Sequence, residues 1–225
     1  GELAAEKKKS DDLLLHILPR DIAEELKRTS RVEPVYYPMA SVLFTDFVAF
    51  TRIAGSMSPA ELLAELDFFF SAFDRIVESH GLEKLKTIGD AYMCAGGVPT
   101  PCDTHAEDAV AAAWEIQRFV DGAIADRRRR GAPYWELRVG VHSGPLMAGV
   151  IGRRKFAYDV WGNTVNLASR LESTSEPGCI NISHATYEKV CHLWDCEPRG
   201  KILAKNAGEI DMYFVRGPRQ PRSSK

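Results

Sequence analysis

The chain has 225 residues, of which 45% are hydrophobic and 27% are charged, and this composition is ordinary for a globular domain with its own core. Its formal net charge of −2 argues against nucleic acid as a partner, because nucleic-acid binding usually goes with a strong basic excess. No apolar run reaches the length of about 18 residues that a membrane-spanning helix needs. The five cysteines are odd in number and form no Cys-x-x-Cys pair, which favours a reduced, cytosolic compartment.

The first 30 residues have the spacing of a helix that Pro19 interrupts. Leu3, Leu14 and Ile17 fall on one side, and a second short helix is expected from Ile22 to Lys27. We interpret residues 1–34 as a helical or coiled-coil connector from an upstream regulatory domain. A simple N-terminal helix packed on its own domain is the alternative.

The elements of the main domain begin with a strand over residues 40–46. Ser58, Pro59 and Glu61 then form a capping box with proline at the first helical position, which predicts a helix that ends near Gly81. Two strands, over residues 83–88 and 91–97, are expected around a turn at Gly89 and Asp90.

A second helix is expected to open at Thr104, followed by a hairpin of residues 136–142 and 146–151. After a loop and a short strand that lead to Asp159, four further elements complete the domain: a helix over residues 163–172, a strand at 180–182, a helix capped by Ser183, and a strand at 211–215. This order predicts an α+β, ferredoxin-like (palm-type) βαββαβ sheet with helices on one face and C-terminal β/α additions. We place the domain at residues 35–217 and a disordered tail at 218–225.

Two aspartates stand at the ends of apolar, strand-like runs: Asp46 after Val42–Thr45, and Asp90 after Lys86–Gly89. A carboxylate in such a place is desolvated unless a positive group meets it. Two of them on neighbouring strands could hold a pair of divalent ions, the usual device for in-line displacement at a phosphate. Each could also be a plain cap or turn residue.

Three further polar residues lie in contexts that suggest a substrate. Lys86 lies in an otherwise apolar strand and needs an acceptor. In a helix over residues 163–172, Asn166 and Arg170 stand one turn apart on one face, with Asp159 just upstream. An i,i+4 surface pair is the alternative for Asn166 and Arg170.

These segments together resemble the class III nucleotidyl cyclases, which make cyclic AMP or cyclic GMP from the triphosphate. The similarity runs from about Met39 to Gly217 and is most specific in Lys86–Met93 and in Tyr158–Arg170. The resemblance implies that Asp46 and Asp90 bind two divalent metal ions, Mg²⁺ or Mn²⁺. It further implies that Asn166 orients the ribose and Arg170 stabilises charge in the transition state.

The resemblance also implies which residues bind the nucleotide. Lys86 and Asp159 match the adenine-reading pair, and a lysine that donates beside an aspartate that accepts is complementary to adenine and not to guanine. Five other positions match groups that hold the phosphates: Phe47, Phe50, Thr51, Arg154 and Lys205. Ala49 departs from the glycine usual in the family, and the Lys205–Gly208 segment departs from its usual Lys-Gly-Lys-Gly.

The function implied is an adenylyl cyclase that acts on ATP. In the family, the metal aspartates come from one subunit and the other site residues from its mate, so a head-to-tail homodimer with two composite sites is expected. A guanylyl cyclase, a non-catalytic nucleotide-binding cyclase-like regulatory domain and a polymerase-like palm remain as alternatives.

Overall fold

The computed structural model describes residues 6, 9, 14, 15, 17–152, 156–204 and 208–220. Most of the helix expected before Pro19 therefore lies outside the described residues. The strands in chain order are β1 (Val35–Phe47), β2 (Glu83–Ile88), β3 (Ala91–Gly96), β4 (Leu137–Ile151), β5 (Ala157–Trp161), β6 (Ile180–Ser183), β7 (Trp194–Ala204) and β8 (Gly208–Pro218). The helices are α2 (Arg20–Thr29), α3 (Phe50–Ala54), α4 (Pro59–Ser79), α5 (His105–Arg130), α6 (Asn163–Ser173) and α7 (His184–Val190).

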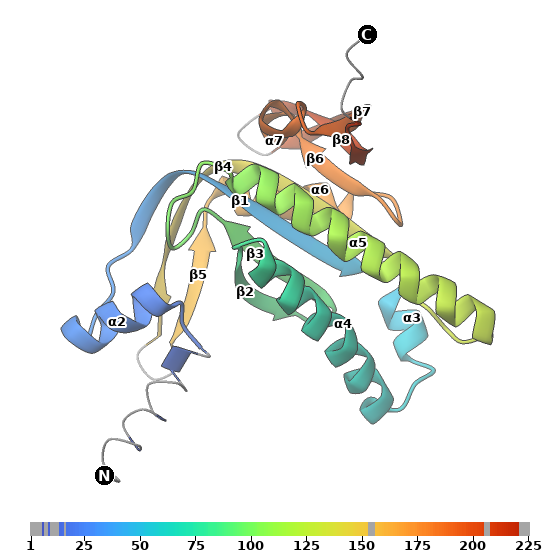
Figure 1. Ribbon diagram of the computed structural model, residues 1–225, viewed down its shortest axis with the longest axis horizontal. Helices are drawn as coiled ribbons and strands as arrows, with labels where there is room; N and C mark the ends of the chain where they lie inside the picture. Colours follow the sequence, from blue (N-terminus) through green and yellow to red (C-terminus); the bar gives the residue numbers. More distant parts are fainter. Residues whose placement is uncertain are drawn as a thin grey trace.

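The described strands form one mixed sheet in the order β2-β3-β1-β4-β6-β8-β7, and β5 pairs with β4 outside this path (Figure 1). The first four strands of this order, with α4 and α5 as their crossovers, are the βαββαβ unit of a ferredoxin-like fold. The predicted fold class is therefore confirmed. The capping box of α4 is also present, because Ser58 Oγ accepts from the N–H of Glu61 and Glu61 accepts from the N–H of Ser58.

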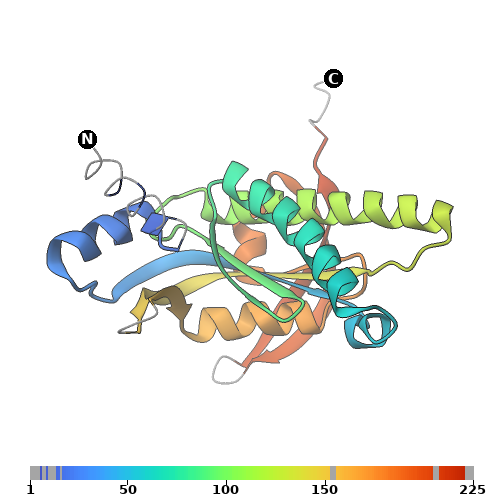
Figure 2. The ribbon, with the colours of Figure 1, turned by 90° about the horizontal axis from the view of Figure 1, so that it is seen from below.

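Helices cover both faces of the sheet. Figure 2 shows α4 and α5 on one face and α6 on the other. The larger core cluster lies under α4 and α5 and includes Phe47, Phe73 and Ile116. A second cluster joins Ile22 of α2 to Phe44 and Ala168 on the opposite face. The helices of the ferredoxin-like unit thus share one face as predicted, while the later helix α6 covers the other.

The hairpin predicted for residues 136–151 is wrong, because β4 runs without a turn from Leu137 to Ile151. Gly144 pairs with Ala40 and Leu146 with Tyr37, and the register of β1 shifts between these pairs. Pro145 falls opposite that irregularity, where its missing N–H removes no regular ladder bond. The Thr164 hydroxyl donates to the Pro145 carbonyl at 2.6 Å, which fixes this point of β4 against the start of α6.

The C-terminal part of the chain adds a hairpin that was only half predicted. Ser183 caps α7 as expected, with its hydroxyl accepting from the Thr186 N–H. The predicted strand over 211–215 is part of the longer β8, and its antiparallel partner β7 was not predicted. No helix among the described residues is both long enough and apolar enough to cross a bilayer.

Candidate active site

Asp46 and Asp90 lie at one end of neighbouring strands. Asp46 is the second-last residue of β1, and Asp90 lies in the turn between β2 and β3. The pairing of Thr45 with Tyr92 brings the end of β1 beside this turn. Burial, and next the negative charge of Asp46, raises the pKa of Asp90 to about 6, while a backbone hydrogen bond from Phe47 opposes the shift. The charge of Asp46 thus lies close enough to Asp90 to disfavour ionisation of the Asp90 carboxyl.

An arginine and a glutamate that the sequence did not single out complete this carboxylate cluster. Arg138 pairs with Asp46 across β1 and β4, and its Nη2 lies 2.8 Å from Asp46 Oδ2. Its Nε lies 3.1 Å from Glu172 Oε1 of α6. Burial, and next the charge of Asp46, raises the pKa of Glu172 to about 7. The signal was Arg138 itself, which interrupts the apolar strand Leu137–Val141 on the face next to Asp46.

The segment after Asp46 makes the expected turn into a short helix, α3. Phe47 is 2% exposed and its ring packs on Phe69 and Trp135, so only its backbone can meet a phosphate. Phe50 opens α3 with its ring 5.4 Å from that of Trp135, and Thr51 is exposed. Ala49 adopts the left-handed conformation with φ 56°, which explains why a glycine suits this position.

Lys86 of β2 and Asp159 of β5 form an ion pair. The Asp159 side chain is 17% exposed and its second oxygen accepts from the N–H of Val160 at 2.9 Å. The acceptor that the lysine requires is thus the aspartate with which it was predicted to read a purine. The two side chains are brought together within one protomer.

Asn166 and Arg170 lie on the exposed side of α6, one turn apart, as predicted. Arg170 Nη1 donates to the carbonyl of Leu203 in β7 at 2.7 Å. The opposite side of α6 lies very close to β4, since a Cβ built on Gly140 would lie 2.1 Å from the Glu172 nitrogen. This contact sets the height of the helix over the sheet. Arg154 and Lys205 lie outside the described residues.

Among the described residues, Asp46 and Asp90 are the two that could hold a divalent cation. Mg²⁺ and Mn²⁺ prefer oxygen ligands, and a bound cation would relieve the mutual repulsion of Asp46 and Asp90. Within the described ranges, no group of three or more histidine, cysteine, aspartate or glutamate side chains is arranged to hold a metal. The two aspartates fit a cation that takes its remaining ligands from a phosphate and water.

Fold and site together define a catalytic domain of the nucleotidyl cyclase class. The family "Adenylate and Guanylate cyclase catalytic domain" matches residues 32–217, and the chain belongs to this class III cyclase family.

Named relatives include cyclases of both substrate types. The chain is 42% identical over 216 residues to an adenylate cyclase of Mycobacterium tuberculosis, covering 96% of this chain and 48% of the relative. It is 36% identical over 221 residues to the receptor-type guanylate cyclase gcy-5 of Caenorhabditis elegans, covering 96% of this chain and 20% of the relative. The chain thus spans about half, or less, of the length of these curated relatives.

A solved structure agrees in fold. The guanylate cyclase domain of RhGC from Catenaria anguillulae, in complex with GTP, superposes with a TM-score of 0.76 at 32% identity. The match covers 82% of this chain and 100% of that one. Similarity alone therefore gives the family and leaves the purine to be argued from the site.

Proposed function

We propose that this domain is an adenylyl cyclase that converts ATP to 3′,5′-cyclic AMP and pyrophosphate. In this reaction the ribose 3′-oxygen forms a bond to the α-phosphorus, the bond to the β-phosphate oxygen breaks, and the hydroxyl proton is released. The single observation that carries the proposal is the Lys86 and Asp159 pair, which presents one donor and one acceptor side by side.

The pair selects adenine by hydrogen bonding. The Lys86 ammonium can donate to adenine N1, and the Asp159 carboxylate can accept from the exocyclic amine. Guanine offers an N1 hydrogen and an O6 acceptor instead, so it would leave both side chains mismatched. A site built around such hydrogen bonds discriminates by as much as roughly 10⁴-fold, because the rejected substrate leaves buried polar groups unpaired.

The remaining site residues have separate roles. Asp46 and Asp90 would hold Mg²⁺ or Mn²⁺, and what the bound cations supply is a lower pKa for the attacking hydroxyl and neutralisation of the triphosphate. Asn166 would orient the ribose. Arg170 would exchange its bond to the Leu203 carbonyl for the oxygens of the transition state. Phe47, Phe50 and Thr51, with Arg154 and Lys205, would hold the phosphates.

The complete site requires two protomers in this proposal. Asp46 and Asp90 would come from one chain, and Lys86, Asp159, Asn166 and Arg170 from its mate. A head-to-tail homodimer then has two equivalent sites, as expected of a symmetric pair in which the same two surfaces meet twice. Exposed apolar side chains on β4, β5 and the segment between them, such as Ile151, Phe156 and Trp161, give such a dimer an apolar contact.

The test is a product assay with purified protein, Mn²⁺ and either ATP or GTP. Cyclic AMP from ATP, with little cyclic GMP from GTP, supports the proposal. Preferential cyclic GMP formation makes the domain a guanylyl cyclase, and nucleotide binding without any product makes it a regulatory domain. An Asp90→Asn variant assayed in parallel controls for contaminating activity, because it should form neither product.

A further inference from the structure

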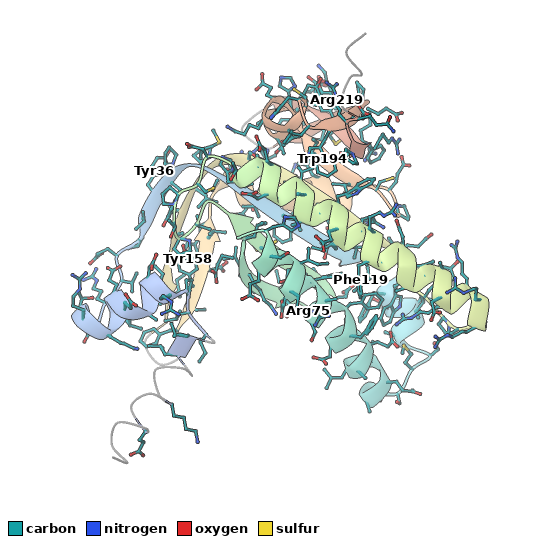
Figure 3. All side chains as sticks on the ribbon, viewed as in Figure 1. Tyr36, Arg75, Phe119, Tyr158, Trp194 and Arg219 are labelled. Carbon is teal, nitrogen blue, oxygen red and sulfur yellow. The ribbon has the colours of Figure 1, made fainter. Side chains whose placement is uncertain are left out.

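A cavity of about 670 Å³ lies away from Asp46 and the Lys86 pair, between α2, the first part of β1 and the loop that leads into α5. Its apolar wall includes Ile22, Tyr36, Met39 and Pro99. Tyr36 is labelled in Figure 3 on the N-terminal part of β1. This volume and lining are typical of a small-molecule pocket.

Two hydrogen bonds hold the walls of this cavity together. The Thr100 hydroxyl donates to Asp21 Oδ2 at 3.1 Å and so ties the loop to α2. The Tyr37 hydroxyl donates to the Pro99 carbonyl at 2.6 Å and ties the same loop to β1. These two hydrogen bonds thus hold the segments that form the boundary of the cavity in place.

His105 lines this cavity and is a buried residue, with 3% of its surface exposed. Its Nδ1 lies 2.8 Å from Ser41 Oγ. From there a chain of hydroxyl groups continues to Ser143 at 2.7 Å and Thr186 at 3.0 Å. None of the described residues makes a hydrogen bond to Nε2, the other ring nitrogen, so this atom is open to a ligand in the cavity.

The hydroxyl chain gives this nitrogen a preferred role. Thr186 Oγ1 lies 3.4 Å from the Val141 carbonyl and 3.2 Å from Ser183 Oγ, and its one hydrogen can go to either acceptor. With either of these bonds made, Ser143 donates to Thr186 and Ser41 donates to Ser143, since each hydroxyl has one hydrogen. His105 Nδ1 then carries the ring hydrogen and donates to Ser41. Nε2 then carries no hydrogen, and its lone pair can accept a hydrogen bond from a donor in the cavity.

The charges around the cavity also favour a donor that is positive. Asp21, Glu25 and Asp103 contribute three carboxylates, against one ammonium from Lys189. No described residue forms an ion pair with any of these three carboxylates. Burial, and next the charge of Lys189, lowers the pKa of His105, so this ring adds no positive charge at neutral pH. The tyrosine rings offer faces that attract cations.

We propose that this cavity binds an organic ammonium ligand, a primary amine on an apolar or aromatic body, with its charge among Asp21, Glu25 and Asp103 and a hydrogen bond to His105 Nε2. The site is separate from the nucleotide site and does not depend on the catalytic assignment. Because β1 runs from this cavity to Asp46, the ligand would contact the strand that carries a predicted metal aspartate.

The test is protein-observed NMR on the full chain with three probes of similar shape: 2-phenylethylammonium, 2-phenylethanol and 3-phenylpropionate. We expect the ammonium probe, at millimolar concentration, to shift the Met39 methyl and His105 ring signals saturably, and the alcohol and the carboxylate to do so less. An Asp21→Asn/Glu25→Gln double variant should weaken ammonium binding about fivefold or more, the loss expected for two partly exposed ionic contacts.

A matched control distinguishes charge from fold. Lys189→Gln removes the one positive side chain of the wall and should leave ammonium binding unchanged or tighter. Asp103→Asn removes one negative charge at an exposed position and is, after Lys189→Gln, the second variant that changes a single charge. Stronger shifts with the carboxylate probe, shifts with none of the probes, or ammonium binding unchanged in the double variant would each overturn the proposal.

Discussion

Lys86 and Asp159, which lie on two different strands, form an ion pair inside a single protomer. A nucleotide that is read by these two groups must therefore enter between partners that already satisfy each other. The cost of opening this pair is offset only by a base that offers an acceptor to the lysine and a donor to the aspartate. Under the proposed function, the ion pair would select the base before any chemistry takes place.

Replacing the lysine of this pair should lower activity on ATP far more than on GTP. Lys86→Ala leaves the mostly buried Asp159 without its cation and removes the donor to adenine N1. We expect kcat/KM for ATP to fall roughly 100-fold or more, the loss of a charged hydrogen bond in a buried site. Measuring kcat/KM for both nucleotides checks this expectation.

Lys84 in the same strand is the matched control for this variant. It pairs with Asp74 at 2.7 Å on the α4 side, away from Asp159. Lys84→Ala should leave the ratio of the ATP and GTP rates unchanged. Equal losses for ATP and GTP in Lys86→Ala would show that the lysine does not read the base.

Arg138 should stabilise the carboxylate cluster in the absence of metal. In Arg138→Ala, the side chains of Asp46 and Glu172 lose the cation that lies 2.8 Å and 3.1 Å from them. We expect the free energy of unfolding to fall by about 2 kcal/mol, less than for a fully buried pair because Arg138 and Asp46 are both about one quarter exposed. Saturating Mn²⁺ should restore part of this loss, as followed by denaturant unfolding with and without the ion.

The exposed arginine at position 216 provides the comparison for this experiment. Its Nε lies 2.6 Å from Glu197, but the two side chains are 46% and 59% exposed. Arg216→Ala should therefore cost less than about 1 kcal/mol and show no dependence on Mn²⁺. Manganese that stabilises both variants equally would mean that the ion acts elsewhere than at Asp46.

Replacing Ala49 with glycine should increase the free energy of unfolding. Its φ of 56° and ψ of 27° place a side chain in the left-handed region. Glycine relieves that strain of about 1–2 kcal/mol at some cost in unfolded-state entropy, so Ala49→Gly should stabilise by roughly 0.5 kcal/mol. Ala64→Gly, at an exposed position within α4, should instead destabilise by about 1 kcal/mol. If Ala49→Gly and Ala64→Gly shift the midpoint temperature of thermal unfolding in the same direction, the backbone at Ala49 is not strained.

His142 should make the fold sensitive to mild acid. Burial lowers its pKa to about 4 in the folded state, below the ordinary 6.5 of the unfolded chain. The unfolded state therefore binds more protons between these values, and the contribution is complete above about pH 6.5 and is lost as the pH falls toward 4. The expected total is about 3 kcal/mol.

The measurement is the free energy of unfolding against pH for wild type and His142→Asn, since the asparagine keeps a polar group near Ser183. The difference between the two curves should shrink as the pH falls through this window. His192→Asn, at an exposed histidine, should run parallel to wild type. Parallel curves for His142→Asn would refute the depressed pKa.

Local patterns predicted much of this fold because they act within a few residues. The capping box at Ser58, the turn at Gly89 and the face shared by Asn166 and Arg170 all have the predicted form. The hairpin at residues 143–145 was wrong because glycine and proline mark turns only when no neighbouring strand accommodates them, and here the irregularity of β1 does so. The β7 strand carries Pro198 and Gly200 at its register shifts, so its sequence reads as a loop.

The site residues likewise fall into those that the sequence predicts and those that become evident only in the folded chain. Motif residues such as Lys86 and Asp159 could be named in advance, and the structure adds that they pair. Arg138 and Glu172 could not be named, because their importance arises from the cross-strand register with Asp46 and from the close approach of α6 at Gly140. Such relationships exist only after the chain has folded.

The most direct measurement of the central claim mixes two inactive variants, Asp46→Ala and Arg170→Ala. If each site takes its metal carboxylates from one protomer and its Asn166 and Arg170 from the mate, half of a random mixture is heterodimer and each heterodimer has one intact site. The mixture should then recover roughly a quarter of the wild-type cyclic AMP production. Heterodimers isolated through two different affinity tags that remain inactive would contradict the shared site.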